Sequence, residues 1–318
     1  MTKVLYIVGW GRSGSTILGN VLGELDGFFH TGELWGLWGS FEKGPEGFHA
    51  RRCGCGERVE DCEIWGPALR TCASGLYPAE VKRWYKKVVR LRYTVRLIRG
   101  RPATGTSREA LAAYLELLNC LYATIADATD SRVIVDSSSR PPDAAVLRML
   151  SGVRPYFLHM VRDPRAVAYS WTRQTLRPDT RRELPRHGST NSTINWLTWN
   201  LAAEMLGRRN GSEGYLRIRY EDFVRDPRET VLAIADFVGE PRNELPFIDG
   251  RTARLGTNHT VWGNPVRFSS GDVEIRDDRE WREALGAVPR VIATVMALPR
   301  LRRYGYPIRS GAERESSG

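Results

Sequence analysis

The chain has 318 residues and a formal net charge of +10, from 47 basic and 37 acidic side chains. This length suits one large α/β domain and excludes a small module held together only by disulfides or a metal. No apolar run approaches the 18 or more residues of a membrane helix, so we expect no membrane span. The positive charge favours a partner that carries phosphate: nucleic acid, a membrane surface or a small molecule.

In chain order, the predicted elements alternate between strands and helices. Residues 3–9 predict a buried strand and residues 14–25 the helix that follows it. Residues 26–77 are rich in Gly, Trp, Phe and Cys without periodicity, and predict an irregular surface region. Further helices are expected at 78–99, 107–129, from Asp163-Pro164, at 192–208, at 227–238 and up to about 301, with strands at 132–136, 155–161 and 215–219 and mostly loop at 240–280.

This alternation predicts an α/β fold with a parallel doubly wound sheet and helices on both faces. We expect one domain over residues 1–308, with 26–130 as a cap-like helical and irregular insertion in it. Residues 309–318 predict a disordered tail. The N-terminus lacks a signal-peptide pattern, so we expect a cytoplasmic protein.

The cysteines are Cys53, Cys55, Cys62, Cys72 and Cys120, and this odd number argues against a secreted disulfide framework. The first three could hold a metal if His49 or Cys72 served as a fourth ligand. They lack the paired C-x2-C spacing of familiar zinc sites, so we expect no metal and favour a local disulfide or plain thiols.

The sharpest motif is the turn Gly9-Trp10-Gly11-Arg12-Ser13-Gly14-Ser15-Thr16 between the first strand and the first helix. Its backbone N–H groups and the helix dipole predict a binding site for a phosphate group. Compared with a Walker A loop, Ser15 stands where a triphosphate-binding lysine is required, and Arg12 is the only cation. A kinase or GTPase is therefore disfavoured.

The segment from Gly11 to Thr16 resembles the 5′-phosphosulfate loop of sulfotransferases that use 3′-phosphoadenosine 5′-phosphosulfate (PAPS). Arg12 occupies the position at which that family has Lys or Arg. The segment 161–170 resembles the family's 3′-phosphate motif, in which an arginine that ends a strand, here Arg162, is followed eight residues later by a serine, here Ser170. An arginine fork and a hydroxyl are suited to one phosphate group.

Three more segments resemble the bacterial branch of that family: Asp136–Arg140, Arg219–Phe223 and His259–Phe268. The resemblance implies PAPS as co-substrate, 3′-phosphoadenosine 5′-phosphate (PAP) as product, and no metal. The nucleotide contacts that it implies are Gly11, Arg12, Ser13, Gly14, Ser15, Thr16, Ile17, Arg162, Ser170, Arg267 and Phe268. We expect Arg267 and Phe268 to close over the nucleotide.

For the chemistry, we expect in-line transfer of the sulfuryl group with Arg12 at the leaving phosphate. A base should take the proton of the acceptor, and Glu33 is the first candidate. Glu33 could instead brace its loop or cap a helix. His30 is the second candidate for the base and Asp136 the third.

The acceptor is expected to be a small molecule with a hydroxyl or amine, of aromatic, glycosylated or lipidic character. Five aromatic residues suggest it: Trp35, Trp38, Phe41, Phe48 and Trp65. These residues could equally form the core of an irregular subdomain. The arginine-rich segment 173–186 is expected to act as a lid.

The sequence leaves two other classes of function open. A P-loop phosphotransferase would turn over ATP with magnesium, and an arginine-rich nucleic-acid binder would bind duplexes in a salt-sensitive way. Unbroken blocks of basic residues are absent, so we expect no nucleic-acid partner. The sequence leaves the oligomeric state open.

Overall fold

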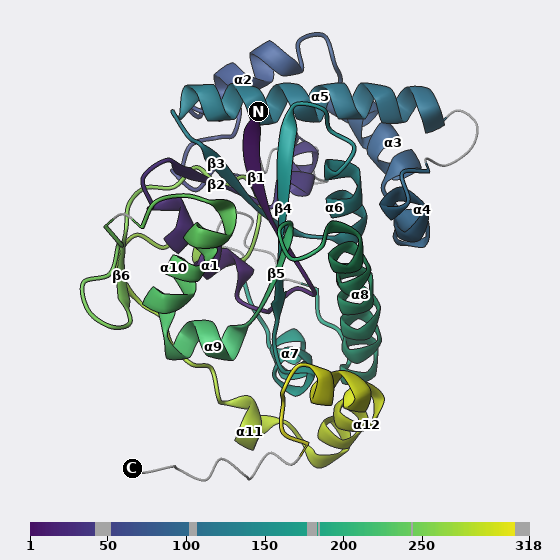
Figure 1. Ribbon diagram of the computed structural model, residues 1–318, viewed down its shortest axis with the longest axis vertical. Coiled ribbons are helices and arrows are strands. Elements are labelled where there is room, and N and C mark those ends of the chain that lie inside the picture. The colour runs from purple at the N-terminus through teal and green to yellow at the C-terminus, as the bar shows by residue number, and fades with distance from the viewer. Residues whose placement is uncertain (42–51, 102–106, 177–182, 184, 243, 309–318) are drawn as a thin grey trace.

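The computed structural model describes residues 1–41, 52–101, 107–176, 183, 185–242 and 244–308. Its centre is a five-stranded sheet in the order β2-β3-β1-β4-β5 (Figure 1). The strands are β1 (Thr2–Val8), β2 (Phe28–Gly32), β3 (Val133–Ser139), β4 (Val153–Val161) and β5 (Tyr215–Arg219). All four pairings between them are parallel, which confirms the predicted α/β fold.

Both faces of the sheet are covered, and β1 shows why. Its side chains alternate, so Leu5 and Ile7 pack on one face while Val4, Tyr6 and Val8 pack on the other. The first face is covered by α1 (Ser15–Gly23) and α10 (Pro227–Val238), and the second by α5 (Ser107–Ala128), α6 (Pro141–Leu147) and α8 (Ser189–Asn210) (Figure 1). A central parallel strand that is apolar on both sides requires such double cover.

The structure corrects two expected elements. Residues 26–77 are not wholly irregular, because β2 forms the edge of the sheet, with Phe28 opposite Val133 and His30 opposite Val135. The expected helix at 78–99 is divided into α3 (Pro78–Val88), η2 (Leu91–Tyr93) and α4 (Thr94–Ile98). The division falls at Val89, whose backbone leaves the helical region (φ −96°, ψ 89°).

The other elements complete the layers around the sheet. They are η1 (Leu34–Phe41), α2 (Trp65–Cys72), α7 (Pro164–Thr172), α9 (Tyr220–Arg225), β6 (Thr252–Leu255), η3 (Pro265–Phe268), β7 (Gly271–Glu274), α11 (Trp281–Ala284) and α12 (Ala287–Arg303). The antiparallel pair β6–β7 lies inside the expected loop region 240–280. Among the described helices, none has the length and apolar character that a membrane crossing requires.

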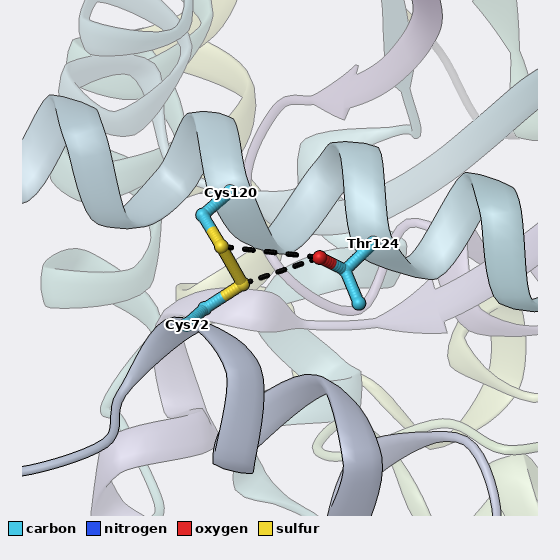
Figure 2. Close-up of a disulfide and its surroundings, with 3 residues drawn as sticks. All are labelled: Cys72, Cys120 and Thr124. Atoms are coloured by element: carbon cyan, nitrogen blue, oxygen red, sulfur yellow. Dashed lines mark hydrogen bonds between the residues drawn. A yellow bond between two sulfur atoms is a disulfide. The ribbon is translucent and has the colours of Figure 1, made fainter.

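One disulfide joins Cys72 at the end of α2 to Cys120 in α5 (Figure 2). The two residues are 48 positions apart, so this bridge is not the local one that the sequence suggested. Thr124, one turn further along α5, lies 3.3 Å from the sulfur of Cys72 through its Oγ1. The bridge fastens α2 to the long helix that covers the sheet.

Helix α1 packs so closely on β2 that replacing Gly19 by alanine should destabilise the protein. A Cβ at Gly19 would lie 2.4 Å from Nε2 of His30, whose ring is itself held by hydrogen bonds at both nitrogens. We expect Gly19→Ala to lower the free energy of unfolding by about 1–3 kcal/mol in urea titrations, despite the better helix propensity of alanine. Gly250→Ala, where a Cβ meets nothing within 4 Å, is the control; equal stabilities of the two variants would contradict this packing.

Candidate active site

The predicted phosphate loop lies between Val8, where β1 ends, and Ser15, where α1 begins. Strand β1 is central, with β3 on one side and β4 on the other. The loop therefore stands where the chain order reverses across the sheet, at the carboxyl ends of the strands. In open α/β sheets this crevice is the usual place for a ligand.

The backbone of the loop leaves the first amides of α1 accessible to an anion. Gly14 caps the helix in a left-handed conformation (φ 87°) and, as a glycine, has no side chain that could accept a hydrogen bond from the N-terminal amides. A Cβ at Gly14 would lie 2.6 Å from the ring of Tyr220, so only glycine fits. Arg12 is also left-handed (φ 70°), a costly conformation for a residue with a side chain and one that is concentrated at functional sites.

The side chains of the loop have different tasks. Ser13 is buried and donates from Oγ to the carbonyl of Trp10 at 2.8 Å, so it stabilises the turn. The guanidinium of Arg12 lies 5.1 Å from the ring centroid of Trp171, an aromatic contact that orients it. Ser15 accepts a long hydrogen bond of 3.4 Å from Ser139 at the end of β3.

Arg162, at the end of β4, reaches this loop directly. Its Nη1 donates to the carbonyl of Arg12 at 3.1 Å, and its Nη2 donates to Oδ2 of Asp278 at 3.1 Å. The guanidinium also lies 4.3 Å from the ring centroid of Tyr220. The Nε atom is buried and has no hydrogen-bond partner among the described residues. Two motifs 150 residues apart in the sequence thus meet at one place.

A cavity of about 850 Å³ opens beside Arg162 and Tyr220. Eight arginines and five carboxylates line it, so its charge suits an anionic ligand. Five of these arginines were not singled out in the sequence, where they lack any motif spacing: Arg225, Arg251, Arg276, Arg279 and Arg282. Ser170 lies in α7, the helix that follows Arg162, and is half-buried.

Glu33 and Thr16 come together at the 259–268 segment. A Cβ placed on Gly263 would lie 3.7 Å from Oε1 of Glu33 and 3.7 Å from Oγ1 of Thr16, so both side chains face this glycine. The amide of Glu33 donates to the carbonyl of Trp262 at 3.0 Å, and the indole of Trp35 donates to Oε2 at 3.0 Å. The carboxylate is therefore oriented beside the first turn of α1.

His30 lies in a different environment from Glu33. It is buried under α1, with Nδ1 3.1 Å from Oδ1 of Asn20 and Nε2 2.9 Å from Oγ of Ser137. Burial lowers the pKa of His30 to about 3. Both nitrogens of His30 are therefore engaged in the interior, whereas Glu33 is partly exposed.

Asp136, the third candidate for the base, is also enclosed. Its Oδ1 accepts from the amide of Ser138 at 2.8 Å and its Oδ2 from the hydroxyl of Tyr122 at 2.7 Å. Burial raises the pKa of Asp136 to about 6, although these hydrogen bonds oppose the shift. Its contacts hold the end of β3 in place.

Arg267 does not have the position that we expected from the sequence. The side chain is buried, with Nη1 donating to the carbonyl of Thr260 at 2.6 Å and Nη2 to that of Arg52 at 2.6 Å. Its guanidinium lies 4.0 Å from the ring centroid of Phe268. These contacts give Arg267 the role of a brace inside the 259–268 segment rather than that of a clamp on a phosphate.

The expected aromatic pocket is divided by the fold. Trp38 and Trp65 belong to the hydrophobic core, which supports the alternative of a subdomain core for them. Trp35 lies at the site, 5.8 Å from the ring of Trp262 and 4.9 Å from the guanidinium of Arg140. Three expected parts of the site lie outside the described residues: the side chain of Phe41, the whole of Phe48, and residues 177–182 and 184 of the expected lid 173–186.

The fold and the site define an α/β protein with a glycine-bearing turn before α1 at the switch point of a parallel sheet. Comparison with known families goes further: the chain belongs to the sulfotransferase family, whose model matches residues 5–244. No curated protein sequence matches it.

Similar solved structures include the sulfotransferase domain of the Synechococcus PCC 7002 olefin synthase, at 20% identity over 96% of this chain and 95% of that one, with a TM-score of 0.49. A sulfotransferase domain from the curacin biosynthetic pathway has 17% identity over 97% and 99%, with a TM-score of 0.49. A sulfotransferase from Alicyclobacillus acidocaldarius has 13% identity over 95% and 96%, with a TM-score of 0.40.

The buried neutral state of His30 predicts a measurable dependence of stability on pH. The folded-state pKa of about 3 lies below the unfolded value of about 6.5, so on acidification the unfolded chain takes up a proton that the folded chain does not. Stability should therefore fall from about pH 6.5 towards pH 3, with about 1.4 kcal/mol per pH unit from His30. Urea titrations of His30→Gln between pH 6 and pH 4.5 should show a slope smaller by this amount.

His159 is the matched comparison for this experiment. Burial lowers the pKa of His159 to about 4, and Nε2 of its ring is hydrogen-bonded to Oδ1 of Asn200 at 2.7 Å. His159→Gln should therefore also make the loss of stability with falling pH less steep. An unchanged slope in His30→Gln would show that His30 is protonated in the folded protein.

Proposed function

We propose that this protein transfers a sulfuryl group from PAPS to a hydroxyl or amine of a small-molecule acceptor. The observation that carries the proposal is the hydrogen bond from Arg162 to the carbonyl of Arg12, which unites the 5′-phosphosulfate loop with the 3′-phosphate motif. A ligand with phosphate groups at both ends of a ribose would match two such adjoining sites.

On the donor side, the first amides of α1 and the hydroxyls of Ser15 and Thr16 would hold the 5′-phosphate. PAPS supplies an activated sulfuryl group, whose in-line departure leaves negative charge on the bridging phosphate oxygen. Arg12, oriented by Trp171, would stabilise this charge. An arginine stabilises charge without giving up its proton, so its role would be electrostatic.

Arg162 and Ser170 would bind the 3′-phosphate. In the structure, the guanidinium of Arg162 is paired with the carboxylate of Asp278. A phosphate would replace this carboxylate, and the unpaired Nε of Arg162 gives the site a further donor. Tyr220, stacked on Arg162, would keep the guanidinium plane in position.

On the acceptor side, Glu33 would take the proton of the attacking group. Its carboxylate is held by Trp35, and Trp35 in turn packs against Trp262 and Arg140. Arg140 lies 5.6 Å from the ring centroid of Trp199, so a cation and several aromatic rings gather on this side. These groups favour an acceptor with an apolar or aromatic body.

The other two classes of function have weaker support. The loop has no lysine at the position of Ser15, so a nucleoside triphosphate would lack its main cationic contact. The arginines beside Arg162 line a cavity together with carboxylates, an arrangement suited to a small ligand and not to a duplex.

Binding of PAP measured by calorimetry tests the donor site, and adenosine 5′-phosphate isolates the effect of the 3′-phosphate. Arg162→Ala should weaken PAP by about 10- to 150-fold, the equivalent of 1.5–3 kcal/mol for charged hydrogen bonds, and should affect adenosine 5′-phosphate little. Ser170→Ala should also weaken PAP binding, but by a smaller factor than Arg162→Ala.

Asp278→Asn should have the opposite effect on PAP affinity to Arg162→Ala and Ser170→Ala. Because the carboxylate of Asp278 competes with a phosphate for Arg162, its neutralisation should tighten PAP binding and leave adenosine 5′-phosphate unchanged. Failure of wild-type protein to bind PAP, or equal losses for both nucleotides in Arg162→Ala, would contradict the proposed donor site.

Replacement of Glu33 should separate chemistry from nucleotide binding. Glu33→Gln should lower kcat by about 10²–10⁴ for a poorly acidic alcohol acceptor, because the general base is lost, while PAP affinity stays near that of the wild type. The loss should be smaller for a nitrophenol, whose proton leaves readily. Turnover of labelled PAPS measures kcat with the alcohol and with the nitrophenol. Glu80→Gln, on α3, is the control. Full activity of Glu33→Gln on an alcohol would remove Glu33 from this role.

A further inference from the structure

A compact group of potential metal ligands lies behind the acceptor side of the site. Sγ of Cys53, Cys55 and Cys62 and a ring nitrogen of His259 all lie within 4.8 Å of one another. Cys53 and Cys62 are buried, and Nδ1 of His259 lies 3.2 Å from the sulfur of Cys62. All three cysteines are free thiols.

These residues match the requirements of tetrahedral zinc. Structural zinc sites are formed by four Cys and His ligands, with Zn–S bonds of about 2.3 Å that place neighbouring ligand atoms about 3.8 Å apart. From the sequence we expected no metal, and we considered His49 or Cys72 as the fourth ligand of such a site. Cys72 is bound to Cys120 and His49 lies outside the described residues, whereas His259 joins the three thiols from 197 positions beyond Cys62.

The surroundings orient the ligands as in known zinc sites. Nε2 of His259 lies 3.4 Å from Oε1 of Glu63, which leaves Nδ1 to face the sulfurs. A carboxylate on the second nitrogen of a ligating histidine is a common feature of zinc proteins. The indole of Trp65 donates to the carbonyl of His259 at 2.5 Å and so holds the backbone of the histidine beside the cysteines.

We propose that Cys53, Cys55, Cys62 and His259 bind one structural Zn²⁺. Four protein ligands complete the tetrahedron, so no position is left for a water or a substrate, and the metal would have a structural role. The site is separate from the donor site proposed above, and its existence does not depend on the sulfuryl-transfer reaction.

The metal would link two loops that position Glu33. The amide of Gly54 donates to the carbonyl of Thr260 at 2.9 Å, and that of Val261 donates to the carbonyl of Thr31 at 2.9 Å. The next carbonyl, that of Trp262, accepts from the amide of Glu33 at 3.0 Å. Zinc bound between the loop that contains Cys53, Cys55 and Cys62 and His259 would therefore hold the 259–268 segment against β2, the strand that leads to Glu33.

Metal content of the full-length protein tests this proposal. The protein is prepared under reducing conditions, loaded with Zn²⁺ and freed of excess metal, and its zinc is measured by mass spectrometry. We expect roughly one zinc per chain in the wild type and nearly none in Cys62→Ser and His259→Ala. His187→Ala removes a histidine outside the group and should keep the zinc.

Two further measurements cover variants that fail to fold. His259→Cys recreates a four-thiolate site and should retain zinc, and wild-type protein loaded with Co²⁺ should show the strong visible absorption of tetrahedral cobalt–thiolate complexes. A wild type without bound zinc, equal zinc content in Cys62→Ser and wild type, or a disulfide among Cys53, Cys55 and Cys62 in the reduced preparation would each overturn the proposal.

Discussion

The contact between the guanidinium of Arg162 and the carbonyl of Arg12 is the interaction on which the site depends. It joins the end of β4 to the turn after β1, and through Asp278 it also joins the segment before α11. Because β1 and β4 pair in parallel, their carboxyl ends lie side by side at the same end of the sheet. A buried arginine hydrogen-bonded to two other chain segments fixes these three segments relative to one another.

The two sides of the site are built differently. The proposed donor side rests on the sheet and on glycines in left-handed conformations, where backbone amides would provide the donors. The acceptor side depends on the 259–268 segment, which is held by the buried guanidinium of Arg267 and by main-chain hydrogen bonds to residues near Thr31 and Gly54. A site made of loops needs such internal bonds, because loops lack the repeating hydrogen bonds of helices and strands.

Much of the fold follows from local pattern. The apolar run 3–9 and the amphipathic helices predicted the central strand and its cover, since burial on both faces requires a continuous apolar strand. The edge strand β2 was missed because its five residues include a histidine and a glycine, and its pairing with β3 joins residues more than 100 positions apart. Edge strands form by tertiary pairing more than by local preference.

The sequence by itself determined the turn from Gly9 to Thr16 and pointed to Arg162 and Glu33 as candidate site residues. These features are short motifs whose function lies in backbone turns and fixed spacing, and such information is local. Only the tertiary structure decided that His30 is buried, that Arg267 braces a loop, and that His259 joins Cys53, Cys55 and Cys62. Each of these outcomes depends on burial or on contacts between distant segments, and the packing of the whole chain determines both.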